Sequence, residues 1–211
     1  GTIADIVELK NDNRIIAYNG LNSIRCTQNI GLRKLIEKAL IKVSEIEAFH
    51  IGYVIAPRIN AAGRMSNAEK AVELLTTNDI KKAEQIAEEL NCLNSSRKEE
   101  EIKIFNEAVE YIEKQKLYNE KVLIVAGKNW HEGVIGIVAS RITEKYNKPS
   151  IVISNKNGIG KASARSLSYL DMYETLKSVD EFLVKFGGHK LAAGLTVMED
   201  NIDKFSYKVK E

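Results

Sequence analysis

Apolar residues recur along this chain with two different spacings, and the change between them falls near Lys121. Up to about residue 116 the spacing is mostly that of an amphipathic helix, with apolar positions three and four residues apart. Beyond Lys121, short apolar runs alternate with helical stretches, as in strands and helices that form a parallel or mixed sheet. The pattern therefore predicts two lobes, one largely helical and one α/β.

The first lobe is expected to begin with strands and continue with helices. Residues 1–20 carry apolar groups on either side of a polar turn at 10–13, and they predict short strands. Residues 50–65 contain Pro57 and two glycines, which predicts a loop that leads into a helix. Between these segments, residues 21–43 have helical spacing, with one apolar face made by Leu32, Leu35, Ile36, Ala39 and Leu40.

A nearly uninterrupted helical pattern runs from Ala68 to about Lys116, with Asp79 as the predicted N-cap of a long helix. The many Glu and Lys residues of this stretch are typical of a solvated helix face with ion pairs four residues apart. In the second lobe, strands are expected at 122–125, 151–153, 162–167 and around 195–197, and helices at 134–145 and 169–179.

Composition restricts the class of protein without identifying its function. The chain has 211 residues, 44% hydrophobic and 28% charged, which is ordinary for a globular protein. It contains no apolar run of the roughly 20 residues that a membrane helix needs, and it does not begin like a secretory signal. Cys26 and Cys92 predict reduced thiols in a cytoplasmic protein. A net charge of +2 does not by itself predict nucleic-acid binding, so that prediction depends on local motifs.

The first motif is the segment 57–64. If it is helical, Asn60 and Arg64 lie four residues apart on one face, among alanines that allow another chain to approach closely. An amide and a guanidinium together can clamp a phosphate. The same spacing fits an arginine that caps a helix or pairs with a carboxylate. The pattern does not distinguish phosphate binding from such a structural role.

The second motif, residues 130–136, follows a strand and opens a helix. His131 is therefore expected at the carboxyl end of a strand, where α/β sheets gather ligand-binding groups. It would either hydrogen-bond a phosphate or cap the helix. A second histidine at zinc-protease spacing is absent, which excludes that motif. Trp130 fits a core or domain-interface position better than a base-stacking one.

The third motif, residues 160–166, is unusual for a strand. Alternate residues of a strand point to the same side, so Lys161, Ser163 and Arg165 are expected to share one face, with alanines on the other. Two cations and a hydroxyl in a row suit a phosphate-bearing ligand. The alternative is an exposed sheet face with ordinary polar residues, although the small residues behind the row favour close packing there.

The fourth motif, residues 186–194, contains paired glycines before a histidine. Gly187 and Gly188 predict a tight turn with exposed backbone N–H groups, a potential anion nest, and His189 is expected at the start of a following helix. Asp5 is expected at the end of a short strand. One carboxylate does not make a divalent-metal site, and the sequence shows no further Asp and His cluster.

Together these segments resemble the RecJ family of the DHH phosphoesterase superfamily, nearly from end to end. Residues 1–7 resemble the last motif of the DHH catalytic domain, and residues 58–64 a segment that precedes the connecting helix. Residues 130–141 are similar to the opening signature of the DHH-associated domain, and residues 187–194 to its closing glycine-histidine motif. Residues 161–166 resemble a Lys-Gly-Ser-Gly-Arg-Ser row in which alanines replace both glycines.

The resemblance implies an α/β fold in three parts: residues 1–66 as the end of the DHH catalytic domain, 67–118 as a helical connector and 119–211 as a mixed-sheet DHH-associated domain that binds nucleic acid. It implies a Mn²⁺- or Mg²⁺-dependent hydrolase that degrades single-stranded DNA from 5′ to 3′ in the cytoplasm, in DNA repair and recombination. Its partners would be single-stranded DNA and other repair proteins, without a membrane.

The resemblance also implies roles for individual residues. Asp5 would be a metal ligand and thereby catalytic. Binding of DNA or its phosphates would fall to Arg58, Asn60, Arg64, His131, Lys161, Ser163, Arg165, Gly187, Gly188 and His189. The chain begins without a methionine and is expected to be a piece of a longer protein, because the Asp-His-His motifs that hold the metals are not in it. The piece alone is therefore expected to be inactive.

Two other functions fit part of the pattern. One is a DHH phosphodiesterase that acts on cyclic dinucleotides or very short oligonucleotides, although the long connector and residues 58–64 argue against it. The other is a non-catalytic module that binds single strands.

Overall fold

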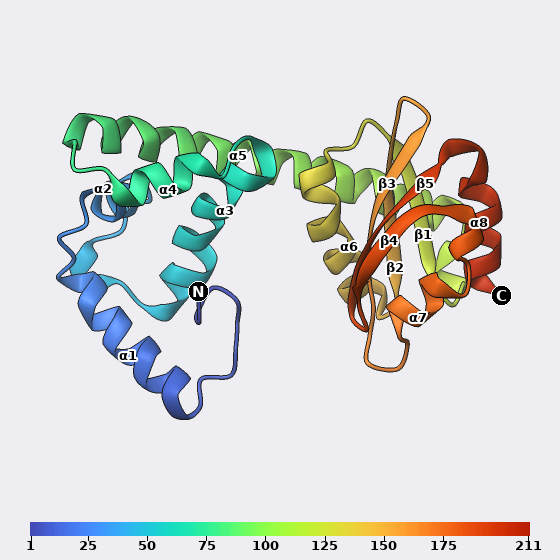
Figure 1. Cartoon of the computed structure of the whole chain (residues 1–211), viewed down its shortest axis with the longest axis horizontal. Coiled ribbons are helices and arrows are strands. Elements are labelled where there is room, and N and C mark those ends of the chain that lie inside the picture. Colours follow the sequence, from blue (N-terminus) through green and yellow to red (C-terminus); the bar gives the residue numbers. More distant parts are fainter. The chain divides into compact units, whose positions relative to one another are not determined.

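The computed structural model describes residues 1–211 and divides into two compact units, residues 1–98 and residues 99–211 (Figure 1). The boundary falls inside one long helix, α5 (Ile80–Lys114). Each unit has its own hydrophobic core. No helix is both long enough and apolar enough to cross a membrane, and Cys26 and Cys92 are exposed free thiols.

The first unit is helical. It consists of α1 (Asn11–Arg25), α2 (Ile30–Lys38), a short 3-10 turn at Val43–Glu45, a π-helical turn at His50–Ile55, α3 (Ala56–Met65), α4 (Glu69–Thr76) and the first part of α5. Helices α2 and α4 approach very closely at Gly31, where a Cβ atom would lie 1.7 Å from the carbonyl oxygen of Leu74. The core of this unit includes Leu35, Ile36, Ile55, Ala62, Leu74 and Leu90.

The strands predicted for residues 1–20 are wrong. The structure has a turn at residues 2–6 and helix α1 from Asn11, so Asp5 lies in a turn rather than at a strand end. A strand needs a partner to satisfy its backbone hydrogen bonds, whereas a helix satisfies them within itself. All five strands of the sheet lie between residues 123 and 198, so no partner strand was available to the N-terminal segment.

Two further predictions for this unit need correction. The helical pattern at 21–43 is interrupted at residues 26–29, where the Asn29 side chain caps α2, and Leu40 is 94% exposed rather than part of the apolar face. The expected loop within residues 50–65 is helical throughout. Pro57 lies at the start of α3, directly after the π-helical turn, where the backbone hydrogen bonds change from the i→i−5 to the i→i−4 pattern.

The long helical stretch is confirmed, and so is its cap. Asp79 Oδ1 accepts hydrogen bonds from the backbone N–H groups of Lys81 and Lys82, at 2.8 and 3.2 Å. The charges on α5 do not behave as predicted, because several pair with other helices instead of with neighbours four residues away. Glu88 pairs with Lys38 of α2, Glu89 with Lys70 of α4, and Lys82 with Glu73 of α4. These ion pairs join α5 to the rest of its unit.

The second unit contains a mixed sheet, as predicted, but with five strands rather than the four expected, because residues 183–189 also form a strand. Its strands are β1 (Leu123–Lys128), β2 (Ser150–Lys156), β3 (Ile159–Arg165), β4 (Leu183–His189) and β5 (Ala192–Met198), in the order β1-β2-β3-β5-β4. Strands β1 and β2 are parallel and all other pairs are antiparallel. The helices are α6 (Glu132–Tyr146), α7 (Met172–Lys177) and α8 (Ile202–Lys210), and short 3-10 turns precede β1, β4 and α8.

The two faces of this sheet are covered differently. One face packs against α7 and α8 and forms the core, which includes Ile151, Ile153, Ala162, Ala164, Met172, Leu176, Leu195 and Phe205. On the other face, α6 lies over β2 and β3. It is fixed there by Ser150 of β2, whose hydroxyl donates to the Ala139 carbonyl and contacts the Thr143 hydroxyl, both at 2.8 Å.

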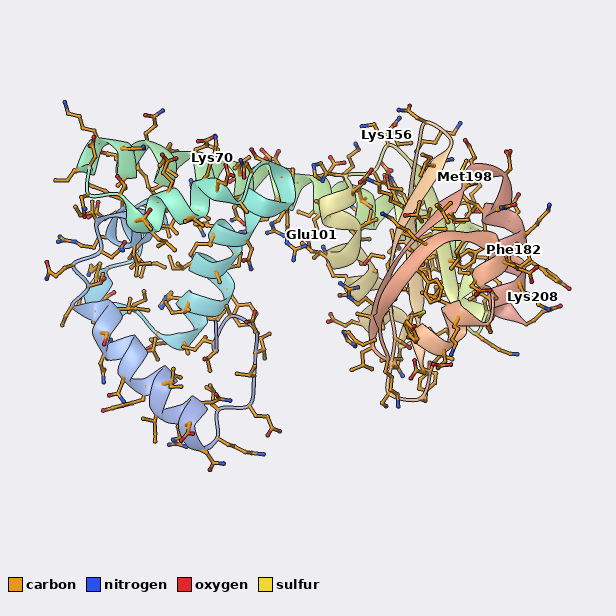
Figure 2. All side chains as sticks on the ribbon, in the orientation of Figure 1. Lys70, Glu101, Lys156, Phe182, Met198 and Lys208 are labelled. Atoms are coloured by element: carbon orange, nitrogen blue, oxygen red, sulfur yellow. The ribbon has the colours of Figure 1, made fainter.

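Within the second unit, the C-terminal part of α5 contacts α6 through polar side chains. Glu101, labelled in Figure 2, accepts from Arg141 Nη1 of α6 at 2.9 Å, and the Arg141 guanidinium lies 4.0 Å from the centre of the Phe105 ring. The Tyr146 hydroxyl donates to Glu113 at 2.7 Å. Burial and this bond to a carboxylate both raise the pKa of Tyr146, so its hydroxyl stays protonated and able to donate.

Trp130 anchors the loop between β1 and α6. Its side chain is 7% exposed, its Nε1 donates to Glu107 of α5 at 2.7 Å, and its ring lies against Gly127, where a Cβ atom would be 2.1 Å from Cε2. The packing role expected for Trp130 is therefore confirmed.

We predict that Gly127→Ala destabilises the second unit by about 1–3 kcal/mol, because the added methyl group has to displace a packed ring. The chain has one tryptophan, so urea unfolding followed by its fluorescence reports on this site, and a red-shifted emission of the folded variant is expected. Gly20→Ala is the control, since a Cβ atom there meets nothing within 4 Å. Equal stability of Gly127→Ala and the parent chain would contradict the prediction.

Candidate nucleic-acid interface

The predicted row on β3 is present. Lys161, Ser163 and Arg165 are exposed or half-buried, whereas Ala162 and Ala164 between them point into the core. The row therefore lies on the face of the sheet that carries α6. Close packing behind the row is confirmed, and the core accounts for the small residues at the alternate positions.

Helix α6 runs along this row with matching spacing. Glu132 pairs with Lys161 at 2.6 Å, Gly136 lies beside Ser163, and Ser140 contacts Arg165. Four helical residues rise about 6 Å and two strand residues about 6.7 Å. Every fourth residue of α6 therefore lies beside every second residue of β3. Each residue of the row thus has a partner position on the helix.

The Arg165 guanidinium is held in a defined position. Its Nε donates to the Ser140 hydroxyl at 3.2 Å, and its Nη1 donates to the Ser163 hydroxyl at 3.0 Å and to the Ala164 carbonyl at 2.8 Å. Ser140 in turn donates to the carbonyl of Gly136 at 3.2 Å. Because the Ser163 oxygen accepts from Arg165, its own hydrogen remains available for another acceptor.

Gly136 makes this arrangement possible. A Cβ atom at this position would lie 3.1 Å from the Ser163 hydroxyl and 3.2 Å from Arg165 Nη2. Both distances are tighter than ordinary van der Waals contact, so a larger residue would push the two polar side chains away from the helix. The absence of a side chain lets α6 and β3 approach with the cation between them.

His189 does not begin a helix, and the predicted turn at the paired glycines is wrong. Gly187, Gly188 and His189 form the end of strand β4, and the hairpin turn follows at residues 190 and 191. The registers pair Arg165 with Ala192 and Ala192 with His189, so the three lie in one row across the sheet. Directly paired residues share a face, and His189 is therefore on the same face as Arg165.

The glycines of β4 differ in what surrounds them. Gly188 has φ +151°, and a Cβ atom there would lie 2.3 Å from the Ala192 carbonyl, so glycine is required. Gly187 is paired with Gly194, which is paired with Ser163, and a Cβ atom at Gly187 meets nothing within 4 Å. The face of β4 and β5 beside the β3 row is thus an open floor.

His131 caps α6. Its Nδ1 accepts a hydrogen bond from the backbone N–H of Gly133 at 3.1 Å, which is one of the two roles that the sequence left open. The capping leaves Nε2 of the ring for another partner. His131 precedes Glu132, the residue that pairs with Lys161, so it lies at the same end of the row.

Three of the predicted site residues lie on α3 in the first unit. Asn60 and Arg64 are exposed and Ala61 and Ala62 are buried, as expected for a helix with one polar face. Arg58 is half-buried; its Nε donates to Asn91 of α5 at 3.0 Å and its Nη1 to the Val54 carbonyl at 2.8 Å. Burial lowers the pKa of Arg58. These bonds give Arg58 a structural role in joining α3 to α5.

Asp5 is exposed and does not belong to a metal site within this chain. The structure contains no group of three or more His, Cys, Asp and Glu side chains placed to hold a metal ion. A hydrolytic Mg²⁺ or Mn²⁺ site needs several carboxylates or histidines. The donors of this chain alone therefore do not fit such a site.

The residues that position the row are not evident from the sequence. Glu132, Gly136 and Ser140 belong to the segment 130–141, and nothing in that segment predicts contacts with β3. The sequence does contain one relevant pattern. Glu132, Gly136 and Ser140 are four residues apart, and Lys161, Ser163 and Arg165 are two residues apart. These two spacings become related only because α6 lies over β3 in the structure.

The chain is similar to known proteins along its whole length. Residues 119–211 match the model of the DHHA1 domain. The single-stranded-DNA-specific exonuclease RecJ of Bacillus subtilis is 38% identical over 213 residues, which cover 100% of this chain and 27% of that protein. The exonuclease of the same name from Escherichia coli is 36% identical over 220 residues, which cover 100% of this chain and 38% of that protein.

The same likeness holds for solved structures. The crystal structure of RecJ from Thermus thermophilus in complex with Mg²⁺ is 34% identical, with a TM-score of 0.85 over 99% of this chain and 32% of that one. A structure of exonuclease RecJ bound to manganese has a TM-score of 0.87 over 99% of this chain and 51% of that one. The chain spans between 27% and 38% of the curated relatives it matches. Over its whole length, it belongs to the RecJ family of the DHH phosphoesterase superfamily.

Proposed function

We propose that this chain is the DNA- and phosphate-binding half of a metal-dependent exonuclease that degrades single-stranded DNA from 5′ to 3′ in DNA repair and recombination, in the cytoplasm. One observation carries the proposal. A cation held between α6 and β3, Arg165, lies in register with His189 beside an open glycine floor. Arg165 and Ser163 would hold the 5′ phosphate, and His189 and the backbone of Gly187 and Gly188 would contribute further donors.

The openness of the floor favours a polymer over a small ligand. Pockets for small molecules bury most of the ligand surface, whereas a Cβ atom at Gly187 meets nothing within 4 Å and one at Gly194 meets only the Ala162 carbonyl, at 3.9 Å. A single strand can lie along such a floor and continue beyond it. Contacts of this kind go mainly to phosphates, so we expect weak discrimination between bases.

The first unit has a separate part in the proposal. Residues 1–66 would be the end of the catalytic domain and residues 67–118 the connector to the binding domain at 119–211. Asp5 would provide one metal ligand, and the other ligands would come from portions of the relatives that this chain does not span. Asn60 and Arg64 on the polar face of α3, with His131 and Lys161 in the second unit, would bind the DNA backbone, and Arg58 would support α3.

A second candidate function is single-strand binding by the 211-residue chain alone. Because its donors do not assemble a metal site, it would bind single strands without cutting them. This agrees with the main proposal if the longer protein supplies the missing ligands.

We predict that Arg165→Ala weakens binding of a 5′-phosphorylated single strand by about 1.5–3 kcal/mol, the scale of a charge-assisted hydrogen bond. The same strand without its 5′ phosphate should lose less affinity. Arg165→Lys should recover only part of the loss, since lysine cannot bind bidentately. Fluorescence anisotropy of labelled oligonucleotides measures all three affinities.

The matched control is Lys204→Ala, an exposed lysine of α8 on the opposite, core-facing side of the sheet, which should bind like the parent chain. Thermal unfolding of each variant shows whether Arg165 acts through stability. Equal losses for both strands would make Arg165 a general backbone contact and would remove its role at the 5′ end.

We also predict that the 211-residue chain alone has no nuclease activity in Mn²⁺ or Mg²⁺, because one aspartate does not hold the metal. Release of mononucleotides from a labelled single strand is the measurement. Mn²⁺-dependent digestion that disappears in Asp5→Ala would refute the prediction.

A further inference from the structure

Two lysines, Lys161 and Lys185, lie in a second row across the sheet, on either side of the buried Thr196. The registers pair Lys161 with Thr196 and Thr196 with Lys185, so these three residues lie side by side on β3, β5 and β4. Directly paired residues share a face, and Lys185 therefore lies on the face of Lys161, Ser163 and Arg165. Its neighbour Phe186 packs into the core on the other face.

Lys185 differs from Lys161 in its charge environment. Lys161 is partly neutralised by Glu132, whose carboxylate lies 2.6 Å from its amine. The Lys185 side chain is exposed and has no carboxylate partner. Of the two lysines in this row, Lys185 therefore offers its full charge to a ligand on the floor.

The two rows are separated by a row without bulky side chains. Between Arg165–His189 and Lys161–Lys185 lie Ser163, Gly194 and Gly187. A Cβ atom on Gly194 would have the Ala162 carbonyl, at 3.9 Å, as its nearest neighbour, and one on Gly187 would have no neighbour within 4 Å. Four strand residues span about 13 Å, which is longer than one sugar–phosphate repeat of an extended single strand.

We propose that Lys185, beside Lys161, forms a second phosphate subsite that binds an internal phosphate of the single strand whose 5′ end lies at Arg165. The strand crosses Gly194 and Gly187, which lack the side chains that would keep its backbone away from the sheet. The proposal rests on the proposed function, because it takes the Arg165 row as the site of the first phosphate.

A length series tests the proposal on the 211-residue chain. The ligands are thymidine 5′-monophosphate and the 5′-phosphorylated thymidine di- and trinucleotides, titrated without divalent metal and followed by calorimetry or amide chemical shifts. Lys185→Ala should leave binding of the mononucleotide unchanged. It should weaken binding of the trinucleotide about three- to fivefold, the scale of one exposed ion pair.

A second variant tests the floor separately from the charge. Gly194→Val places a β-branched side chain where space is open and where strands favour such residues, so the thermal midpoint should be unchanged or higher. Trinucleotide binding should nevertheless fall at least as much as in Lys185→Ala. Lys156→Ala, which removes an exposed lysine at the end of β2 (Figure 2), should change neither affinity and is the charge-matched control.

The possible outcomes separate this inference from the proposed function. If Arg165→Ala weakens every ligand while Lys185→Ala and Gly194→Val weaken none, the second subsite is wrong and the proposed function stands. If Arg165→Ala changes no affinity, the proposed function itself fails. An equal effect of Lys185→Ala on the mononucleotide and the trinucleotide would place Lys185 at the first phosphate and overturn the subsite.

Discussion

The close packing of α6 against β3 is the constraint on which the second unit depends. Gly136 favours this packing, because a Cβ atom there would lie only 3.1 Å from the Ser163 hydroxyl and 3.2 Å from Arg165 Nη2. Ser150 fixes the same helix to β2 through Ala139 and Thr143, so its position does not rest on one contact. A guanidinium confined between a helix and a strand keeps few alternative positions, and less conformational entropy remains to be lost when it binds a phosphate.

The placement of α6 also determines where a ligand can bind. The helix occupies the face of β2 and β3 and leaves that of β4 and β5 open, while α7 and α8 cover the opposite face. An uncovered sheet face normally carries polar side chains that interact with water. Here the middle of that face carries glycines and its margins carry cations. A ligand can therefore contact the backbone of the sheet and the charged side chains at the same time.

The arginines and lysines of the chain divide between support and binding. Arg58 and Arg141 donate hydrogen bonds to neighbouring elements and hold α3 and α6 in place. Arg165 does both, since its internal bonds fix the guanidinium at the edge of the open floor. Lys185 has no such partners. The net charge of +2 does not show this division, because several of the cations on the helices pair with carboxylates.

The sequence by itself determined the fold class, the long helix with its Asp79 cap and the shared face of Lys161, Ser163 and Arg165, because each follows from local signals: the alternation of strand and helix patterns, a capping side chain and the period of a strand. It did not determine the N-terminal helix or the strand that ends at His189. Strand formation depends on the presence of a partner, and Gly187 and Gly188 become part of a strand only because β5 pairs with them. The contacts of Gly136 and Ser140, and the row that joins Arg165 to His189, exist only in the tertiary structure, because their residues come from different elements and their proximity is decided by packing and register.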